Sequence, residues 1–482
     1  MTGILRSFYQ EEKDLRNYDV LIIGAGLAGI FAGYELSKAQ PELQIAILER
    51  GVSIRDRSCP IVAGKTPSCI NCPTCDIMRG FGGAGAFSDG KFNFTTQFGG
   101  WLNEYISDQE VMNLIEYVDE VNQSFGATKE YFSTYGEAAD QIRQRALGAD
   151  LHLLDARCKH LGTERNREIL IAQFDYLEQH LDLLCRHKVE RINRDSTGQW
   201  ILETDRGEFS APYLIAAPGR SGAEWFSEQC RELDIPLLNN QVDLGVRVEL
   251  PAAVFKQVTD AVYEAKIKYR TRCHGDIVRT FCMNPYGHVV TENTDGIITV
   301  NGHSYTDPAL QSNNTNFALL VSNKFTEPFN EPYRYGKHIA ALSNMLGGGV
   351  MVQRLGDLLD GRRSNEHRLA RSFVRPTLNA TPGDLSLVLP KRHLDNIIEM
   401  IAALDKLTPG IANSDTLLYG VEVKFYSSRI TLSDELETPL KNLFAVGDGA
   451  GVTRGLSQAG ASGVYVARNI LKRMGKQLPQ EI

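Results

Sequence analysis

The sequence predicts an α/β protein in which a parallel sheet takes strands from both ends of the chain and is interrupted by an inserted α+β domain. A short apolar run at Tyr18–Ile23 is followed by a glycine-rich turn and a helical pattern through about Lys38. A second apolar run lies at Leu43–Leu48, which completes a βαβ unit. Near the other end, a strand is expected at Leu443–Val446 and a helix from about Leu456 to Arg473.

The composition is that of a large globular protein. The 482 residues exceed the usual size of one domain, and 43% are apolar while 23% are charged. The net charge of −8 argues against a nucleic-acid partner. No run of 18 apolar residues is present, so we expect no membrane span. The first residues lack the apolar core of a secretory signal, and we expect a cytoplasmic protein.

The middle of the chain predicts further helices and strands, and then a region in which short strands dominate. Helical patterns cover about 108–124 and 163–186, and 189–209 alternates around a turn, as in a β-meander. Tyr213–Ala217 is another apolar strand, after which short strand-like stretches dominate. We therefore expect a nucleotide-binding domain at 1–235 with a cysteine-rich insert at 55–80, an inserted substrate or cap domain at 236–419, and a return of the first domain at 420–482.

The strongest motif is Gly24-Ala25-Gly26-Leu27-Ala28-Gly29, which follows a strand and opens a helix. Gly24 permits the tight turn, Gly26 lets the backbone approach a pyrophosphate, and Gly29 allows close packing of helix and strand. The helix N-terminus supplies N–H groups to the diphosphate. Glu49 ends the next strand 20 residues after Gly29, where it would accept hydrogen bonds from ribose hydroxyls. This predicts a Rossmann-like dinucleotide site.

Two later segments favour FAD as the dinucleotide. Phe444–Asp448 is a strand that ends in Gly-Asp, and it resembles the segment that lies beside the flavin ribityl chain in two-dinucleotide-binding flavoproteins. The stretch Leu214–Arg220 resembles the third strand and turn of the same fold. The helix that follows Asp448 would stabilise negative charge on the reduced flavin.

The whole chain resembles the FAD-dependent dehydrogenase family labelled NAD(FAD)-utilising dehydrogenases. The segments that match are GFGGAGAFSDGK at 80–91, DLGVRVE at 243–249, FCMNPYGHVV at 281–290, VNGHS at 300–304, EVKFYSSR at 422–429 and VGDGAG at 446–451. The resemblance implies an FAD domain of the glutathione-reductase type with an inserted domain. The expected FAD-binding residues are Gly24, Gly26, Leu27, Ala28, Gly29, Glu49, Arg50, Gly83, Ser88, Val189, Ala217, Gly219, Gly447, Asp448 and Gly455.

Four residues are candidates for catalysis. In related flavoproteins the segment at Gly80–Lys91 runs along the flavin ring, so Lys91 is placed to stabilise developing negative charge, unless it is a surface lysine. Tyr286 and His288 would donate a proton to a substrate carbon, although a structural role is the alternative. Arg454 lies before the last helix, where it would face the flavin pyrimidine or an acidic substrate group.

A cluster of cysteines precedes the glycine-rich loop. Cys59, Cys69, Cys72 and Cys75 supply four thiols, which suit a tetrahedral zinc ion. The Cys-x2-Cys-x2-Cys run also matches three ligands of a [4Fe–4S] cluster, although the distal Cys-Pro precedes the run instead of following it. A dithiol, a disulfide or inert thiols are the third interpretation.

The flavin motifs predict an FAD-dependent oxidoreductase that transfers a hydride between flavin N5 and a small-molecule substrate, at a C=C or C–C bond. No second Rossmann fingerprint occurs between residues 150 and 440. The reducing equivalents would therefore come from NAD(P)H as a transient donor in a non-Rossmann pocket, from a partner protein or from the substrate. One alternative is a flavin and iron–sulfur electron-transfer subunit that serves a partner enzyme through a ferredoxin-like carrier. A second alternative is a non-catalytic flavin-binding sensor.

Overall fold

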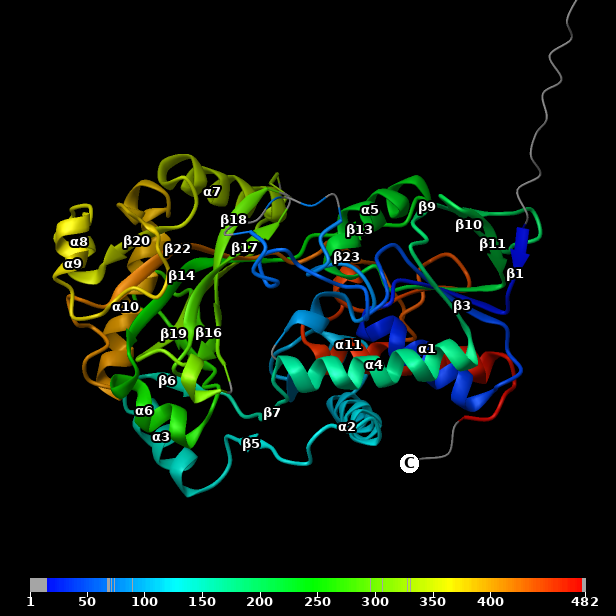
Figure 1. Ribbon diagram of the computed structural model, residues 1–482, viewed down its shortest axis with the longest axis horizontal. Coiled ribbons are helices and arrows are strands. Elements are labelled where there is room, and N and C mark those ends of the chain that lie inside the picture. Colours follow the sequence, from blue (N-terminus) through cyan, green and yellow to red (C-terminus); the bar gives the residue numbers. More distant parts are fainter. Residues whose placement is uncertain are drawn as a thin grey trace, which may run out of the picture.

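The computed structural model describes residues 15–66, 70, 72, 74–88, 90–294, 296–305, 307–326, 328–329 and 331–478. Its helices and strands form two groups on opposite sides of the molecule (Figure 1). One group is built around a parallel sheet and the other around a mostly antiparallel sheet. None of the described helices is long and apolar enough to cross a membrane.

A five-stranded parallel sheet forms the centre of the first group. Its order is β24-β12-β2-β3-β8, and every neighbouring pair is parallel. The first and last thirds of the chain therefore share one sheet, which confirms the expected Rossmann-like arrangement. The strands are β2 (Val20–Ile23), β3 (Ile45–Glu49), β8 (Asp182–Cys185), β12 (Tyr213–Ala216) and β24 (Leu443–Ala445).

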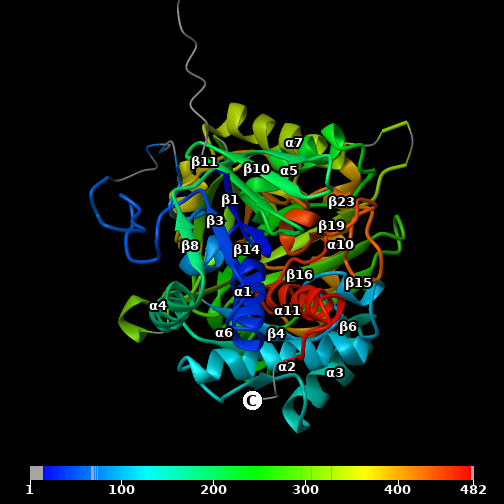
Figure 2. The same ribbon diagram turned by 90° about the vertical axis from the view of Figure 1, so that its right-hand side faces the viewer.

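Two helices from opposite ends of the chain pack on each other beside this sheet. They are α1 (Leu27–Ala39) and α11 (Leu456–Arg473), and Figure 2 shows them side by side. The predicted helix at 163–186 ends earlier, as α4 (Thr163–His180), because the following residues are extended and pair with β3 as strand β8. The other helices of this group are α2 (Asp108–Ser124) and α5 (Gly219–Glu232).

A β-meander packs beside the parallel sheet, at the position that the alternating pattern predicted. Its antiparallel strands are β9 (Val189–Arg194), β10 (Trp200–Thr204) and β11 (Gly207–Ala211). Strand β1 (Leu15–Asn17) adds to β11 in parallel.

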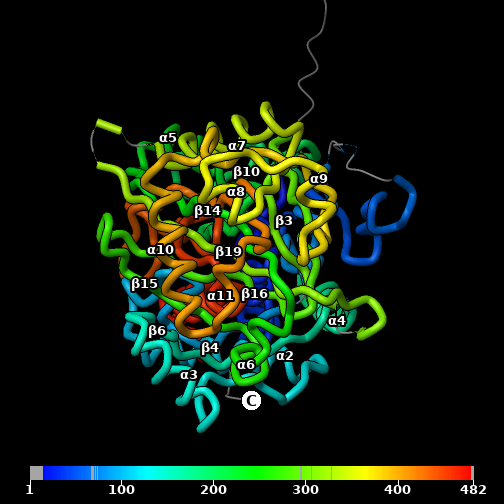
Figure 3. Tube along the Cα trace, turned by 90° about the vertical axis from the view of Figure 1, so that its left-hand side faces the viewer, coloured from blue at the N-terminus to red at the C-terminus, as the bar shows by residue number. Residues whose placement is uncertain are grey.

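The second group is built on an eight-stranded sheet of order β21-β20-β22-β14-β19-β16-β15-β6. Figure 3 faces this side of the molecule and shows α7, α8, α9 and α10 in front of the sheet. The strands are β6 (Leu151–Leu153), β14 (Val242–Pro251), β15 (Ile267–Arg270), β16 (Ile277–Asn284), β19 (Asn314–Asn323), β20 (Met351–Arg354), β21 (Thr381–Pro382) and β22 (Leu417–Lys424). The helices are α3 (Glu137–Leu147), α6 (Ala252–Ala261), α7 (Pro332–Gly347), α8 (Leu355–Leu359), α9 (Glu366–Ala370) and α10 (Lys391–Leu407).

Smaller sheets and short helices complete the fold. Strands β17 (His288–Thr294) and β18 (Ile297–His303) form a hairpin. The other small strands are β4 (Lys91–Phe94), β5 (Phe132–Ser133), β7 (Arg157–His160), β13 (Leu237–Leu238) and β23 (Arg429–Ile430). The 3-10 helices are η1 (Gly83–Phe87), η2 (Leu102–Glu104), η3 (Pro308–Leu310), η4 (Leu385–Leu387) and η5 (Asp448–Ala450).

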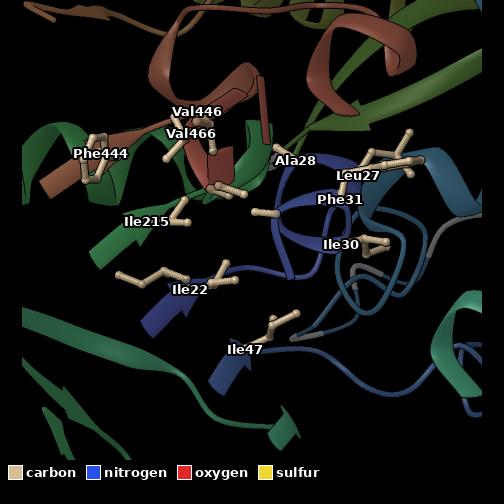
Figure 4. Close-up of a cluster of buried hydrophobic side chains, with 14 of the residues drawn as sticks. Ile22, Leu27, Ala28, Ile30, Phe31, Ile47, Ile215, Phe444, Val446 and Val466 are labelled. Carbon is tan, nitrogen blue, oxygen red and sulfur yellow. The ribbon is translucent and has the colours of Figure 1, made fainter. Parts of the chain in front are cut away.

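One row of buried side chains explains why four parallel strands align. Ile47, Ile22, Ile215 and Phe444 are consecutive partners across β3, β2, β12 and β24. All four are buried, and Figure 4 shows them beside residues of α1 and α11. Burial of apolar area stabilises the fold by about 25 cal/mol per Å², so this row contributes to the stability of the sheet. The register places the carboxyl ends of the strands along one edge.

The buried apolar residues of the second group form a separate large cluster. It includes residues of β14, β19 and α10, and also Leu151 of β6 and Ala146 of α3. Both of these residues lie within 1–235, the range that we expected for the first part of the nucleotide-binding domain. Strand β6 pairs with β15 at the edge of the eight-stranded sheet, which carries this segment away from the parallel sheet.

Candidate functional site

The turn between β2 and α1 requires glycine at two positions. Gly24 has a φ of +94°, and a Cβ on it would lie 2.3 Å from the carbonyl oxygen of Ala217. A Cβ on Gly29 would lie 2.0 Å from the carbonyl oxygen of Gly24. These distances are far below a van der Waals contact, so the turn and the packing of α1 depend on both glycines.

Gly26 differs from its neighbours because it faces open space. A Cβ on Gly26 would meet nothing within 4 Å, and its φ of −76° suits any residue. Leu27 and Ala28 follow as the first residues of α1, whose N-terminus has no side-chain cap and no acidic residue in its first turn. A free helix N-terminus beside an open position fits the diphosphate of FAD.

Glu49, the last residue of β3, connects three loops through hydrogen bonds. Its carboxylate accepts hydrogen bonds from the backbone N–H groups of Ala25 at 3.0 Å, Gly51 at 2.8 Å and Gly80 at 3.0 Å. The role that we predicted, with ribose hydroxyls, would use the lone pairs that remain. The adjacent Arg50 donates to the Ser221 side chain at 2.7 Å, which joins this strand to α5.

The predicted segment at 214–220 lies directly against the turn between β2 and α1. The Ala217 N–H donates to the Ile23 carbonyl at 2.8 Å, which continues the pairing of β12 with β2. Gly219 has a φ of +63°, and a Cβ on Gly449 would lie 2.5 Å from its carbonyl oxygen. The turn at 217–219 is thus held between the motifs near the two ends of the chain.

The Gly-Asp motif near the C-terminus meets the start of α1. Gly447 has a φ of +76°, and a Cβ on it would lie 3.1 Å from the Cβ of Ala28. Asp448 follows, and its carboxylate accepts hydrogen bonds from Thr453 at 2.9 Å and from Arg220 at 3.1 Å. The two motifs that predicted FAD therefore lie together, as one dinucleotide site requires.

The glycine-rich loop also contacts this site. The Gly82 N–H donates to the Ala25 carbonyl at 2.8 Å, and a Cβ on Gly83 would lie 3.3 Å from the Gly26 Cα. Ser88 turns back on the loop and donates to the Gly85 carbonyl at 2.7 Å. Asp89, which the sequence placed in the same loop, lies outside the described residues.

Arg57 holds the glycine-rich loop in place through hydrogen bonds, a role that the sequence analysis did not predict. Its buried guanidinium donates to the carbonyls of Asp76, Phe81 and Gly83 at 2.6 to 2.8 Å. Burial lowers the pKa of Arg57 to about 10, and the negative charges of Glu49 and Asp76 oppose that change. The loop is therefore held both by Arg57 and by the turn between β2 and α1. A lone arginine in a loop gives no sequence signal for such a role.

Lys91 reaches toward the eight-stranded sheet. Its Nζ donates to the Met283 carbonyl at 3.3 Å and to the Asn284 side chain at 3.4 Å, and it lies 4.0 Å from the carboxylate of Glu264. Its side chain is 10% exposed, so a solvated surface lysine is the wrong interpretation. A role toward the flavin stays a prediction.

Arg454 and Gly455 are held by one carbonyl. Their backbone N–H groups donate to the carbonyl oxygen of Gly99 at 3.0 and 2.8 Å. The Arg454 guanidinium lies 4.5 Å from the centre of the Tyr426 ring and donates to the Phe425 carbonyl. The side chain thus extends from the loop before α11 to the end of β22.

The remaining predicted residues lie in other surroundings. Tyr286 has a φ of +52°, and its carbonyl accepts from the Ser312 N–H at 2.9 Å. His288 contacts the Leu310 carbonyl through Nε2 at 3.0 Å. In the described part of the chain, no hydrogen bond or ion pair joins either residue to Lys91 or Arg454. Val189 is buried as the first residue of β9.

The cysteine cluster is only partly described. Cys59, Cys72 and Cys75 are free and partly exposed, and Cys69 lies outside the described residues. Among the described residues, no three His, Cys, Asp or Glu side chains gather as a metal site would need. These thiols therefore do not show a fit to zinc or to an iron–sulfur cluster, and no chemical step is assigned to either.

A set of ionised side chains joins the two groups of elements. We call it the charged cluster, and it consists of Arg220, Asp243, Arg279, Glu292, Lys424, Asp448 and Arg454. Arg279 pairs with Asp243, and both bond to the hydroxyl of Tyr426. Sequence reasoning missed five of these residues, because single charges within apolar strands give no indication of what they face.

The cations of the cluster affect the protonation of one of its carboxylates, Glu292. Burial favours the neutral form of Glu292, but the positive charges of Lys424, Arg220 and Arg454 outweigh it and hold its pKa below the ordinary value. Glu292 belongs to the β17–β18 hairpin, whereas Arg220 belongs to α5 beside the parallel sheet. The cluster therefore lies where the two groups meet, next to Asp448 of the dinucleotide site.

Comparisons with known proteins agree with the motifs. Residues 241–425 match the family described as FAD-dependent protein, C-terminal domain-like. Residues 2–56 also match the Thi4 family. The FAD-dependent dehydrogenase resemblance and the Rossmann-like fold are thus confirmed.

Several individual proteins are similar to this chain. An uncharacterised protein of Clostridium beijerinckii is 25% identical over 475 residues, which are 94% of this chain and 80% of that one. The thiamine thiazole synthase of Yarrowia lipolytica is 44% identical over 51 residues, which are 11% of this chain and 16% of that enzyme. Glycine oxidase from Geobacillus kaustophilus has a TM-score of 0.40 at 14% identity, with 95% of each chain covered.

Proposed function

We propose that this FAD-dependent oxidoreductase transfers a hydride between flavin N5 and a small organic substrate, at a C–C or C=C bond. The observation that carries the proposal is the charged cluster, which includes Asp448 of the dinucleotide site and side chains from both groups of elements. Bound FAD would supply the redox chemistry. The chain would supply the substrate's surroundings, because a cluster of ionised side chains beside a cofactor site is a common feature of substrate-binding sites.

The residues around the flavin site divide into three tasks. The open position at Gly26 and the N-terminus of α1 would hold the diphosphate. Asp448 would orient the ribityl chain through its carboxylate. Tyr426 would keep its proton, because burial raises the pKa of its phenol while its hydroxyl donates to Asp243. Its hydroxyl would then hold Asp243 and Arg279 of the cluster in place.

Cofactor binding is tested first with a substitution that leaves the fold intact. Gly26→Val places methyl groups where the structure has open space, so the variant should fold and bind no FAD. Gly361→Asn is the matched control, because Gly361 also faces open space but lies in the turn after α8, and Asn tolerates its φ of +65°. FAD content after reconstitution measures both. Equal FAD content in the two variants would contradict the assignment of the diphosphate position to Gly26.

The reaction is tested by stopped-flow absorbance under anaerobic conditions. The flavin is reduced chemically, and organic acceptors with a conjugated C=C bond are then mixed with it. We expect reoxidation by at least one organic acceptor much faster than with free FAD. Reoxidation only by one-electron acceptors such as ferricenium would refute hydride transfer and would indicate electron relay.

A further inference from the structure

One cation of the charged cluster has no carboxylate partner in the described part of the chain. Arg279 pairs with Asp243, Lys424 lies 3.0 Å from Glu422, and Arg220 lies 3.1 Å from Asp448. Arg454 bonds through its guanidinium to a single neutral group, the Phe425 carbonyl. A guanidinium carries five donors in a planar fork, so most of its hydrogen-bonding capacity remains for a ligand.

The position of Arg454 is fixed by its surroundings. Its guanidinium lies 4.5 Å from the centre of the Tyr426 ring. The ring of Trp101 packs edge-to-face against that of Tyr426, with the two ring centres 5.3 Å apart. Tyr426 is itself held by Asp243 and by Arg279, which donates to its hydroxyl at 2.7 Å. A side chain held in this way loses little conformational entropy when it binds a ligand.

The electrostatic surroundings favour an anion. Burial and the neighbouring guanidinium of Arg220 lower the pKa of Arg454 below its ordinary value. Two cations that repel each other are stabilised when a negative group enters between or beside them. A carboxylate matches the arginine fork with two parallel hydrogen bonds.

The diphosphate of FAD does not explain this arginine. The diphosphate position lies at Gly26 and the start of α1. The Arg454 side chain instead reaches Phe425 and Tyr426, which follow β22 of the eight-stranded sheet. The Arg454 guanidinium therefore lies against the segment that follows the eight-stranded sheet, and away from the contacts that define the diphosphate position.

We propose that Arg454 binds a carboxylate of the substrate, so that the substrates of this oxidoreductase are small organic acids. The proposal rests on the proposed function, because it places the substrate beside bound FAD. Arg454 is the anchoring residue and Arg220 its supporting charge.

The test uses the FAD-loaded protein with acetate, succinate and benzoate as probes, and benzamide as the neutral counterpart of benzoate. Perturbation of the flavin absorption spectrum reports binding beside the flavin. The shift of the thermal unfolding midpoint with probe concentration reports binding without use of the flavin signal. The variants are Arg454→Met and the control Arg473→Gln. Arg473 also lies over a ring, 5.0 Å from Phe444, but pairs with Glu435 and Glu437 at the surface.

We expect at least one carboxylate to bind the wild type and Arg473→Gln with equal affinity, and benzamide to bind more weakly than benzoate. Arg454→Met should retain FAD and bind the carboxylate about tenfold to hundredfold more weakly, the loss expected for a charged hydrogen-bonded pair. Unchanged carboxylate affinity in Arg454→Met, equal binding of benzamide and benzoate, or no binding of any probe to the FAD-loaded wild type would overturn the proposal. Loss of FAD from Arg454→Met would assign the arginine to the cofactor instead. A wild-type protein that binds no FAD would refute the proposed function itself.

Discussion

Gly463 of α11 lies against the main chain of Ala28 in α1. A Cβ on Gly463 would lie 2.1 Å from the Ala28 carbonyl oxygen and 3.0 Å from its carbonyl carbon. The two helices thus approach so closely that only a hydrogen atom fits between them. Because α1 begins at the proposed diphosphate position, this contact couples the C-terminal helix to the geometry of the dinucleotide site.

The first prediction compares two glycines of this helix. Gly463→Ala should lower the free energy of unfolding by about 1–3 kcal/mol, because the new Cβ meets rigid main chain. Gly460→Ala should be close to neutral, since its Cβ would lie 3.1 Å from side-chain atoms of Phe31 and Val118, and alanine gains helix propensity of about 1 kcal/mol. Urea unfolding measures both. A larger loss in Gly460→Ala would show that the helices do not cross at Gly463.

A second prediction concerns the fully buried ion pair between Arg247 and Glu422. Two guanidinium nitrogens of Arg247 donate to the two carboxylate oxygens of Glu422 at 2.8 and 2.9 Å, with neither side chain exposed. Glu422→Leu should cost about 3–5 kcal/mol, because it leaves the buried Arg247 without its carboxylate. Arg247→Met should cost less, because Glu422 still pairs with Lys424 at 3.0 Å. The double variant should lose clearly less than the sum, since neither charge of the pair remains.

An exposed pair provides the control for that cycle. Arg165 and Glu168 lie 2.7 Å apart with more than half of each side chain exposed. The same double-mutant cycle, with alanine at both positions, should give a coupling of about 1 kcal/mol or less. Similar coupling energies in the two cycles would mean that water reaches Arg247 and Glu422.

The dinucleotide site was predictable because its signal is local. The turn at Gly24–Gly29 needs particular glycines for steric reasons that act within a few residues, and the same holds for the Gly-Asp motif at 447–448. The sequence therefore placed both motifs at strand ends. The helix at 163–186 was predicted too long, because the pairing of β8 with β3 is a tertiary contact that no local pattern reports.

The charged cluster was not predictable for the opposite reason. Asp243, Arg279 and Lys424 each lie in or beside an apolar strand of a different segment, and only the order of the eight-stranded sheet brings them together. A charge within an apolar strand is the one signal that was present, since an ionised side chain in such a strand needs a partner. The identity of that partner depends on the fold.

A third prediction separates the two functions of Tyr426. Tyr426→Phe keeps the ring beneath Arg454 and removes the hydroxyl that bonds to Asp243 and Arg279. Tyr426→Leu removes the ring as well. If the ring positions Arg454, carboxylate affinity should fall little in Tyr426→Phe and about threefold to thirtyfold in Tyr426→Leu, as expected for loss of a cation–π contact. Equal losses in both variants, measured by flavin titration, would assign the effect to the hydroxyl.

The last prediction concerns acid stability and His393 of α10. This side chain is buried, and neither ring nitrogen has a hydrogen-bond partner in the described part of the chain. Burial lowers its pKa from 6.5 to about 4. Between these two values the unfolded chain binds the proton while the folded chain does not, so stability falls as the pH falls. The loss reaches about 3 kcal/mol at pH 4.

Replacement of this histidine should remove that part of the pH dependence. In His393→Leu, the free energy of urea unfolding should decline less between pH 6.5 and pH 4 than in the wild type, because leucine binds no proton. His338→Leu is the control, since it removes an exposed imidazole of α7 in place of a buried one. Parallel pH profiles for the wild type and His393→Leu would show that the imidazole is already charged, or already hydrated, in the folded protein.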